Sequence, residues 1–74
     1  MSKLQDTLSL QGRDYIALHN LLKLKGLCSS GAEAKQAIEQ GKVFVDGQVE
    51  LRKRCKIKVD QTIVFENHSI KIVI

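Results

Sequence analysis

Apolar residues recur at helical spacing in the first third of the chain. Tyr15, Leu18 and Leu22 form one stripe, which predicts an amphipathic helix extending to about Lys25. Asp14 is the predicted N-cap, and the glycine that follows Lys25 is typical of a helix C-terminus.

A second helix of about ten residues is predicted to begin after Ser30. The segment from Ser30 to Glu33 fits the capping-box pattern, in which the serine oxygen accepts from the third amide and the glutamate reaches back to the serine amide. Gly41 ends this helix. Its apolar face is small enough for close packing on the first helix and consists of Ala34, Ala37 and Ile38.

The second half of the chain alternates apolar and polar residues, which is typical of strands. Asp46-Gly47 separates two short β-branched runs and predicts a type I′ hairpin, because both turn positions need φ > 0. In this hairpin Phe44 would lie opposite Val49. A turn is expected at Asn67-His68, and further strands are predicted at residues 7–10, 62–65 and 69–74. Residues 56–59 alternate lysine with Ile57 and Val59, which gives a stretch with one apolar and one cationic face.

Together these elements predict an α+β domain, with two packed helices against a small, mostly antiparallel sheet. We expect residues 1–74 to form a single domain, because the chain has only 74 residues. A chain this short buries only about 60% of its unfolded surface, so its stability is expected to be marginal. That size leaves no room for a buried catalytic cleft beside a core, so we predict that the protein is not an enzyme.

Positive charge is concentrated between Lys23 and Lys58. This segment has nine basic and four acidic residues, whereas the rest of the chain has three basic and four acidic residues. Five of the seven residues from Arg52 to Lys58 are cationic, and their mutual repulsion is unfavourable unless an anion relieves it. Free amides near residues 29–31, at the start of the second helix, would also suit phosphate. The distribution favours nucleic acid, while charge alone leaves a membrane surface or simple solvation open.

Motifs for catalysis, nucleotide binding and metal binding are missing. The sequence has no glycine-rich phosphate loop, and no pair among Cys28, Cys55, His19 and His68 has the spacing of a zinc site. We therefore predict no cofactor and no metal. Cationic neighbours could lower the pKa of the Cys55 thiol, which leaves a thiol-based enzyme as a remote alternative. Because neither a signal peptide nor a membrane span is evident, we expect a cytoplasmic protein with reduced thiols. We also expect a monomer.

The aromatic residues bear on how a nucleic acid would be bound. The chain has only three, and Tyr15 and Phe44 lie at positions predicted to be in the core. This prediction argues against base stacking, so binding should rely on phosphates and overall shape.

A longer pattern connects these features. It consists of Leu21-Leu22, Gly26-Leu27, Ser29, Gly31, Glu33-Ala34-Lys35, Ile38, Gly41, Val43, Val45 and Gly47. With this pattern, a core at about residues 18–65 resembles the RNA-binding domain of small-subunit ribosomal protein S-four, the αL motif. The short flanking sequence is similar to that of stand-alone bacterial members, which are ribosome-associated.

The resemblance implies the αL-type RNA-binding fold and non-catalytic binding of structured RNA, with ribosomal RNA as the expected ligand and ribosome assembly or association as the role. Family members bind RNA with both helices and the following turn, and the matching residues are Lys25, Ser29, Lys35, Lys42, Arg52 and Lys53. The neighbouring Arg54 and Lys56 complete the predicted site. Stand-alone members often have glycine near the position of Arg54. This chain departs from that pattern, and the departure concerns the shape of this loop. The alternative is a protein-interaction module that binds an acidic partner.

Overall fold

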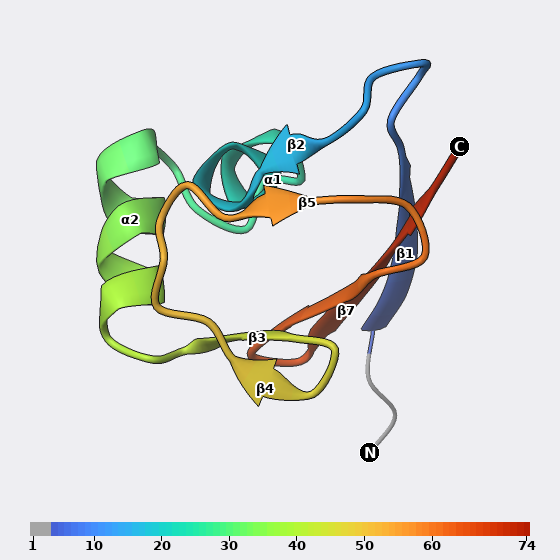
Figure 1. Cartoon of the computed structure of the whole chain (residues 1–74). Coiled ribbons are helices and arrows are strands. Elements are labelled where there is room, and N and C mark those ends of the chain that lie inside the picture. The colour runs from blue at the N-terminus through green and yellow to red at the C-terminus, as the bar shows by residue number, and fades with distance from the viewer. Residues whose placement is uncertain (1–3) are drawn as a thin grey trace.

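The structure is a computed structural model that describes residues 4–74. Two helices and a two-stranded ribbon lie against a five-stranded sheet (Figure 1). In chain order the elements are β1 (Leu4–Ser9), β2 (Ile16–Ala17), α1 (Leu18–Leu24), α2 (Gly31–Glu39), β3 (Val43–Val45), β4 (Gln48–Val49), β5 (Lys56–Ile57), β6 (Thr62–Phe65) and β7 (His68–Val73).

The sheet is mostly antiparallel, as the sequence predicts. Its strand order is β1-β7-β6-β3-β4, and only the pair of β1 and β7 is parallel. The remaining strands, β2 and β5, form a separate antiparallel ribbon. The predicted α+β class is confirmed, and the ribbon is an addition that the sequence pattern did not reveal.

The core lies between the helices and one face of the sheet. Val43 and Val45 of β3 point into it, whereas Phe44 between them lies on the outer face and is 40% exposed. The predicted core position of Phe44 is therefore wrong, because the pleat sends alternate residues to opposite faces. The largest fully buried side chains are Leu18, Leu21, Leu22, Ile38, Ile57, Ile63, Ile70, Ile72 and Val43.

The first helix begins later than predicted. Ala17 is its N-cap and no side chain caps it, so the prediction of Asp14 as the cap is wrong. Residues 16 and 17 pair instead with Ile57 and Lys56 across the ribbon. Tyr15 precedes the ribbon and is 43% exposed, which corrects its predicted core position. The local helical period could not reveal a pairing with a segment so distant in sequence.

The second helix follows the sequence prediction closely. Ser30 is the N-cap, and its Oγ accepts from the amide of Glu33 at 3.2 Å. Its predicted apolar face of Ala34, Ala37 and Ile38 is buried. Gly41 follows the helix with a φ of 76°, a left-handed conformation that suits glycine. Within the described residues, neither helix has the length and apolar content needed to cross a membrane.

The turns of the sheet also follow local rules. Asp46 and Gly47 have φ values of 52° and 86°, which confirms the type I′ geometry, and Phe44 pairs with Val49 across the hairpin. The last turn is at Glu66-Asn67, one residue earlier than predicted, because His68 already pairs with Phe65.

Candidate nucleic-acid interface

The basic loop (residues 52–58) is anchored on the start of α1. The amide of Leu18 donates to the carbonyl of Cys55 at 2.9 Å, and the amide of His19 donates to the carbonyl of Lys53 at 3.2 Å. The Nδ1 of His19 also lies 3.1 Å from the Lys53 carbonyl. These carbonyls take the place of the side-chain cap that α1 lacks. The backbone of the loop is thereby held on the helix.

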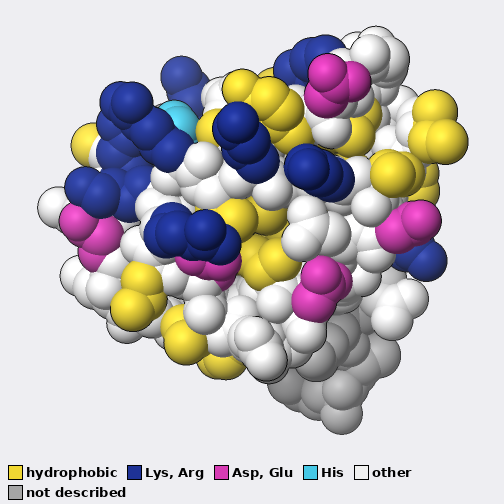
Figure 2. Space-filling model, viewed as in Figure 1, with side chains coloured by type: hydrophobic (Ala, Val, Ile, Leu, Met, Phe, Trp, Pro, Cys, Tyr) yellow, Lys and Arg dark blue, Asp and Glu magenta, His cyan; other side chains and the backbone are white. Residues whose placement is uncertain are grey.

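Side chains of the basic loop line a shallow hollow of about 490 Å³. Figure 2 shows Lys and Arg side chains gathered on this face, over α2 and the chain that leads into β5. Among the described residues, Arg54, Lys56 and Lys58 make no ion pair with a carboxylate. Three positive charges at the hollow are therefore not neutralised by the protein. The residues that line this hollow are Arg52, Arg54, Cys55, Lys56 and Lys58.

The loop keeps its shape without glycine at position 54. The backbone of Arg54 is outside the left-handed region, and the amide of Cys55 donates to the carbonyl of Arg52 at 3.2 Å to close a turn. The left-handed conformation occurs instead at Asp60, whose φ is 73°. Aspartate tolerates this conformation better than most residues. The departure at Arg54 thus adds a positive charge without requiring an unfavourable φ.

Arg52 is held by a carboxylate that precedes it by two residues. Its Nε donates to Glu50 Oε2 at 2.9 Å and its Nη2 donates to Glu50 Oε1 at 3.1 Å, while its backbone amide donates to Oε2 at 3.0 Å. Hydrogen bonding from Arg52 lowers the pKa of Glu50 to about 2. Arg52 therefore contributes a positioned but partly neutralised charge, and sequence reasoning missed the role of Glu50.

Cys55 is half-buried beside this pair. Burial, followed by the carboxylate of Glu50, raises the pKa of the Cys55 thiol and outweighs the opposing effect of Arg52. Arg52 acts in the expected direction, but the expectation of a lowered pKa for the Cys55 thiol is wrong. Cys28 and Cys55 are both free thiols. No group of three or more His, Cys, Asp or Glu side chains within residues 4–74 is arranged to hold a metal ion.

Lys53 links the basic loop to α2. Its Nζ lies 2.9 Å from Glu39 Oε2, at the end of the helix. Lys35 precedes Glu39 by one helical turn, so it lies on the same side of α2. The predicted residues Lys35 and Lys53 therefore come from neighbouring parts of the fold, and Lys53 is paired with the carboxylate of Glu39.

The start of α2 is less open to an anion than the sequence suggests. The carboxylate of Glu33 accepts from the amide and the hydroxyl of Ser29, each at 3.1 Å. The predicted capping box has Glu33 reaching back to the amide of Ser30, whereas in the structure its carboxylate reaches Ser29. Because the Ser29 amide and hydroxyl are both engaged, the expectation of a free amide at Ser29 is wrong.

Lys25 and Lys42 lie apart from the hollow of the basic loop. Lys25 forms an ion pair with Asp6, and its Nζ donates to the carbonyl of Thr7 at 3.2 Å. The hydrogen bond from Lys25 lowers the pKa of Asp6. Lys42 lines a separate hollow of about 240 Å³ with residues that include Glu33 and Glu66. Of the eight predicted site residues, the structure brings three together at the first hollow: Arg52, Arg54 and Lys56.

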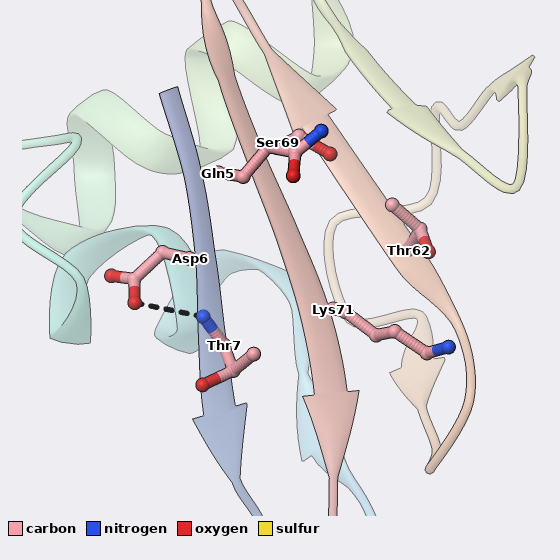
Figure 3. Close-up of a pocket in the computed structure, with 6 residues that line it drawn as sticks. All are labelled: Gln5, Asp6, Thr7, Thr62, Ser69 and Lys71. Carbon is pink, nitrogen blue, oxygen red and sulfur yellow. Dashed lines mark hydrogen bonds between the residues drawn. The ribbon is translucent and has the colours of Figure 1, made fainter. Parts of the chain in front are cut away.

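The outer face of the five-stranded sheet has a different character. It contains a hollow of about 400 Å³ between β1, β7 and β6 (Figure 3). Lys71 is the single cationic residue among those that line it, and Asp6 Oδ1 accepts from the amide of Thr7 at 2.8 Å. This hollow therefore lacks the concentrated positive charge of the basic loop. Its lining residues are Gln5, Asp6, Thr7, Thr62, Ser69 and Lys71.

Comparison with known proteins places this geometry in a family. Residues 8–73 match the model of the S4 domain. The chain belongs to the S4 domain family. This S4 domain is 52% identical over 67 residues to "Putative RNA-binding protein YbcJ" of Escherichia coli (strain K12), covering 90% of the chain and 96% of that protein. It has the same identity and coverage with "Uncharacterized protein YbcJ" of Shigella flexneri.

A solved structure also resembles this S4 domain. The solution structure of YbcJ from E. coli, described as revealing an αL motif involved in RNA binding, has a TM-score of 0.71 and 51% sequence identity. The match covers 92% of this chain and 86% of that chain. Both the predicted family and the predicted αL-type fold are confirmed.

Proposed function

We propose that this S4 domain binds structured RNA without catalysing a reaction. The observation that carries the proposal is the hollow at which Arg54, Lys56 and Lys58 have no carboxylate partner. Arginine can donate two parallel hydrogen bonds to a phosphate, and lysine acts as a point charge. Phosphates of an RNA backbone would relieve the repulsion among these cations. The αL motif described for the related E. coli structure supports the same function.

The proposed contact surface is the basic loop, with Arg52 and Lys53 beside the three unpaired cations. Glu50 and Glu39 orient these two side chains, and phosphates would compete with both carboxylates. Lys35 and Lys42 are proposed as flanking contacts. Lys25 and Ser29 already have intramolecular partners, so we assign them a smaller share of the binding free energy.

Ribosomal RNA is the ligand that we propose first, with a role in ribosome assembly or association. The support is the similarity of the sequence to stand-alone ribosome-associated members of the family. Crosslinking the protein to RNA in cells and sequencing the attached RNA tests this choice. Enrichment of ribosomal RNA is expected, and enrichment of another RNA class would replace the ligand while leaving RNA binding intact.

Salt dependence tests the mechanism of binding. If the five cations of the basic loop neutralise about five phosphates, the slope of log affinity against log salt is roughly −3.5 to −4.5. Affinity for a folded RNA hairpin should then fall on the order of a hundredfold between about 50 and 200 mM salt. A slope near zero would contradict phosphate binding. A denatured strand of the same sequence is the control, and equal affinity for it would contradict recognition of structured RNA.

A further inference from the structure

The ribbon of β2 and β5 places an aromatic ring among lysines. Ile16 pairs with Ile57 and Ala17 pairs with Lys56. Beyond the Ile16–Ile57 pair, Tyr15 therefore lies opposite Lys58. The isoleucines point into the core, and their neighbours therefore point outward. The Nζ of Lys56 lies 5.0 Å from the centroid of the Tyr15 ring.

Tyr15 borders the basic hollow. Lys56 lines that hollow, and its ammonium group lies over the ring of Tyr15. Tyr15 in turn lines a second hollow of about 540 Å³, with residues that include Gly12 and Asn20. The two hollows therefore meet at the contact between Lys56, which lines the first, and Tyr15, which lines the second. A ligand with an anionic part and a flat aromatic part would match this pair of surfaces.

We propose that Tyr15 is a stacking platform for an unpaired base of the bound RNA, with the adjoining phosphates held by Arg54, Lys56 and Lys58. This inference rests on the proposed function. Proteins that hold unpaired nucleotides combine a positively charged surface with an exposed aromatic ring, because every base has a face that can stack. A base on the Tyr15 ring would release Lys56 from its cation–π contact toward a phosphate.

The other exposed aromatic residue lacks these surroundings. Phe44 is 40% exposed on the outer face of the sheet, where its neighbours in register are Val49 and Val64. Within the described residues, the cation–π contact is made by Tyr15 with Lys56, and Phe44 makes none. Phe44 is therefore a matched control, similar in exposure and different in electrostatic environment.

The test uses two RNA hairpins that differ by a single unpaired adenosine in the stem. Fluorescence anisotropy of end-labelled RNA gives both affinities for the intact protein. Wild-type protein should bind the bulged hairpin more tightly. Replacing Tyr15 with leucine should reduce affinity for the bulged hairpin about fivefold to a hundredfold, the range expected for loss of one stacked base. Tyr15→Phe should retain the preference, and Phe44→Leu should leave both affinities unchanged.

Nuclear magnetic resonance gives a direct readout of stacking. Tyr15 is the only tyrosine of the chain, so its ring protons give a single set of tyrosine signals. A base stacked on the ring should move these signals upfield with the bulged hairpin and not with the paired one. The amide spectrum of each variant confirms that it is folded.

The outcomes separate this inference from the proposed function. Equal affinity of the wild-type protein for the two hairpins, without an upfield shift, would overturn stacking at Tyr15 and leave RNA binding standing. A bulge preference that persists in Tyr15→Leu would also overturn it, since the preference would then come from RNA shape. Failure of both hairpins to bind would overturn the proposed function and the inference together.

Discussion

Two segments that the sequence predicts to contact RNA differ in the folded protein. In the α1–α2 connection (residues 25–30), Lys25 is paired with Asp6 and Ser29 is engaged by Glu33. In the basic loop, Arg54 and Lys58 have no such carboxylate partners among the described residues. The difference teaches that a positive charge is available to a ligand only where folding leaves it without an internal partner.

The largest expected effect comes from reversing charge in the basic loop. The double substitution Arg54→Glu and Lys58→Glu should weaken binding of a folded RNA on the order of a hundredfold at low salt, because two phosphate contacts become repulsive. Both residues are exposed, so the fold should be retained. Filter binding or anisotropy measures the affinity, and circular dichroism checks the fold. Unchanged affinity would place the RNA surface elsewhere.

Lys25→Gln is the matched control in the other region. The ammonium group of Lys25 already has Asp6 and the Thr7 carbonyl as partners. Its removal should therefore change RNA affinity by less than about twofold. This change is smaller than the one expected when a phosphate contact of the basic loop is lost. A loss as large as that of the double variant would break the distinction between the two regions.

Ser30→Ala should lower the free energy of unfolding by about 1 kcal/mol, because the hydroxyl that accepts from the Glu33 amide is lost. Affinity of the folded protein for RNA should stay the same. Urea denaturation measures the first quantity and RNA titration the second. The region around α2's start would need a binding role if the affinity fell while the stability did not.

Glu50→Gln should raise RNA affinity by only about twofold to threefold, because a negative charge beside the phosphate surface is removed. The same change tests the pKa of Glu50, which is lowered from 4.5 to about 2. Because the pKa is lower in the folded state, the ionised carboxylate of Glu50 stabilises the fold at pH values above 4.5. This contribution to the free energy of unfolding is lost as the pH falls toward 2.

The variant should lack this part of the pH dependence of unfolding. Urea denaturation of the wild-type protein and of Glu50→Gln, at several pH values between neutrality and about 2, measures the difference between their free energies of unfolding. This difference should narrow as the pH falls. A difference in the free energy of unfolding that stays constant across this range would show that ionised Glu50 does not stabilise the fold through its hydrogen bonds with Arg52.

Local features of the fold were predictable from the sequence. The turn at Asp46-Gly47 needs residues that tolerate positive φ, and the cap at Ser30 acts on an amide three residues away. The start of α1 was not predictable in this way. Its first amides bond to carbonyls of Cys55 and Lys53, more than thirty residues later in the chain.

The candidate site was predictable in composition and not in arrangement. The charge run after Arg52 located the basic loop, and the spacing of two residues between Glu50 and Arg52 was a visible signal for their pairing. The exposure of Tyr15 had no local signal, because it follows from the pairing of β2 with β5.

By itself, the sequence determined the fold class, the family, the two tight structural motifs at Ser30 and Asp46-Gly47, and the segment in which positive charge accumulates. These properties depend on residue types and on neighbours close in the chain. Tertiary structure decided which cations lack an internal carboxylate and which aromatic ring lies beside them. Those properties depend on contacts between distant segments, since Asp6 reaches Lys25 and Lys56 reaches Tyr15 only after the sheet and the ribbon have formed.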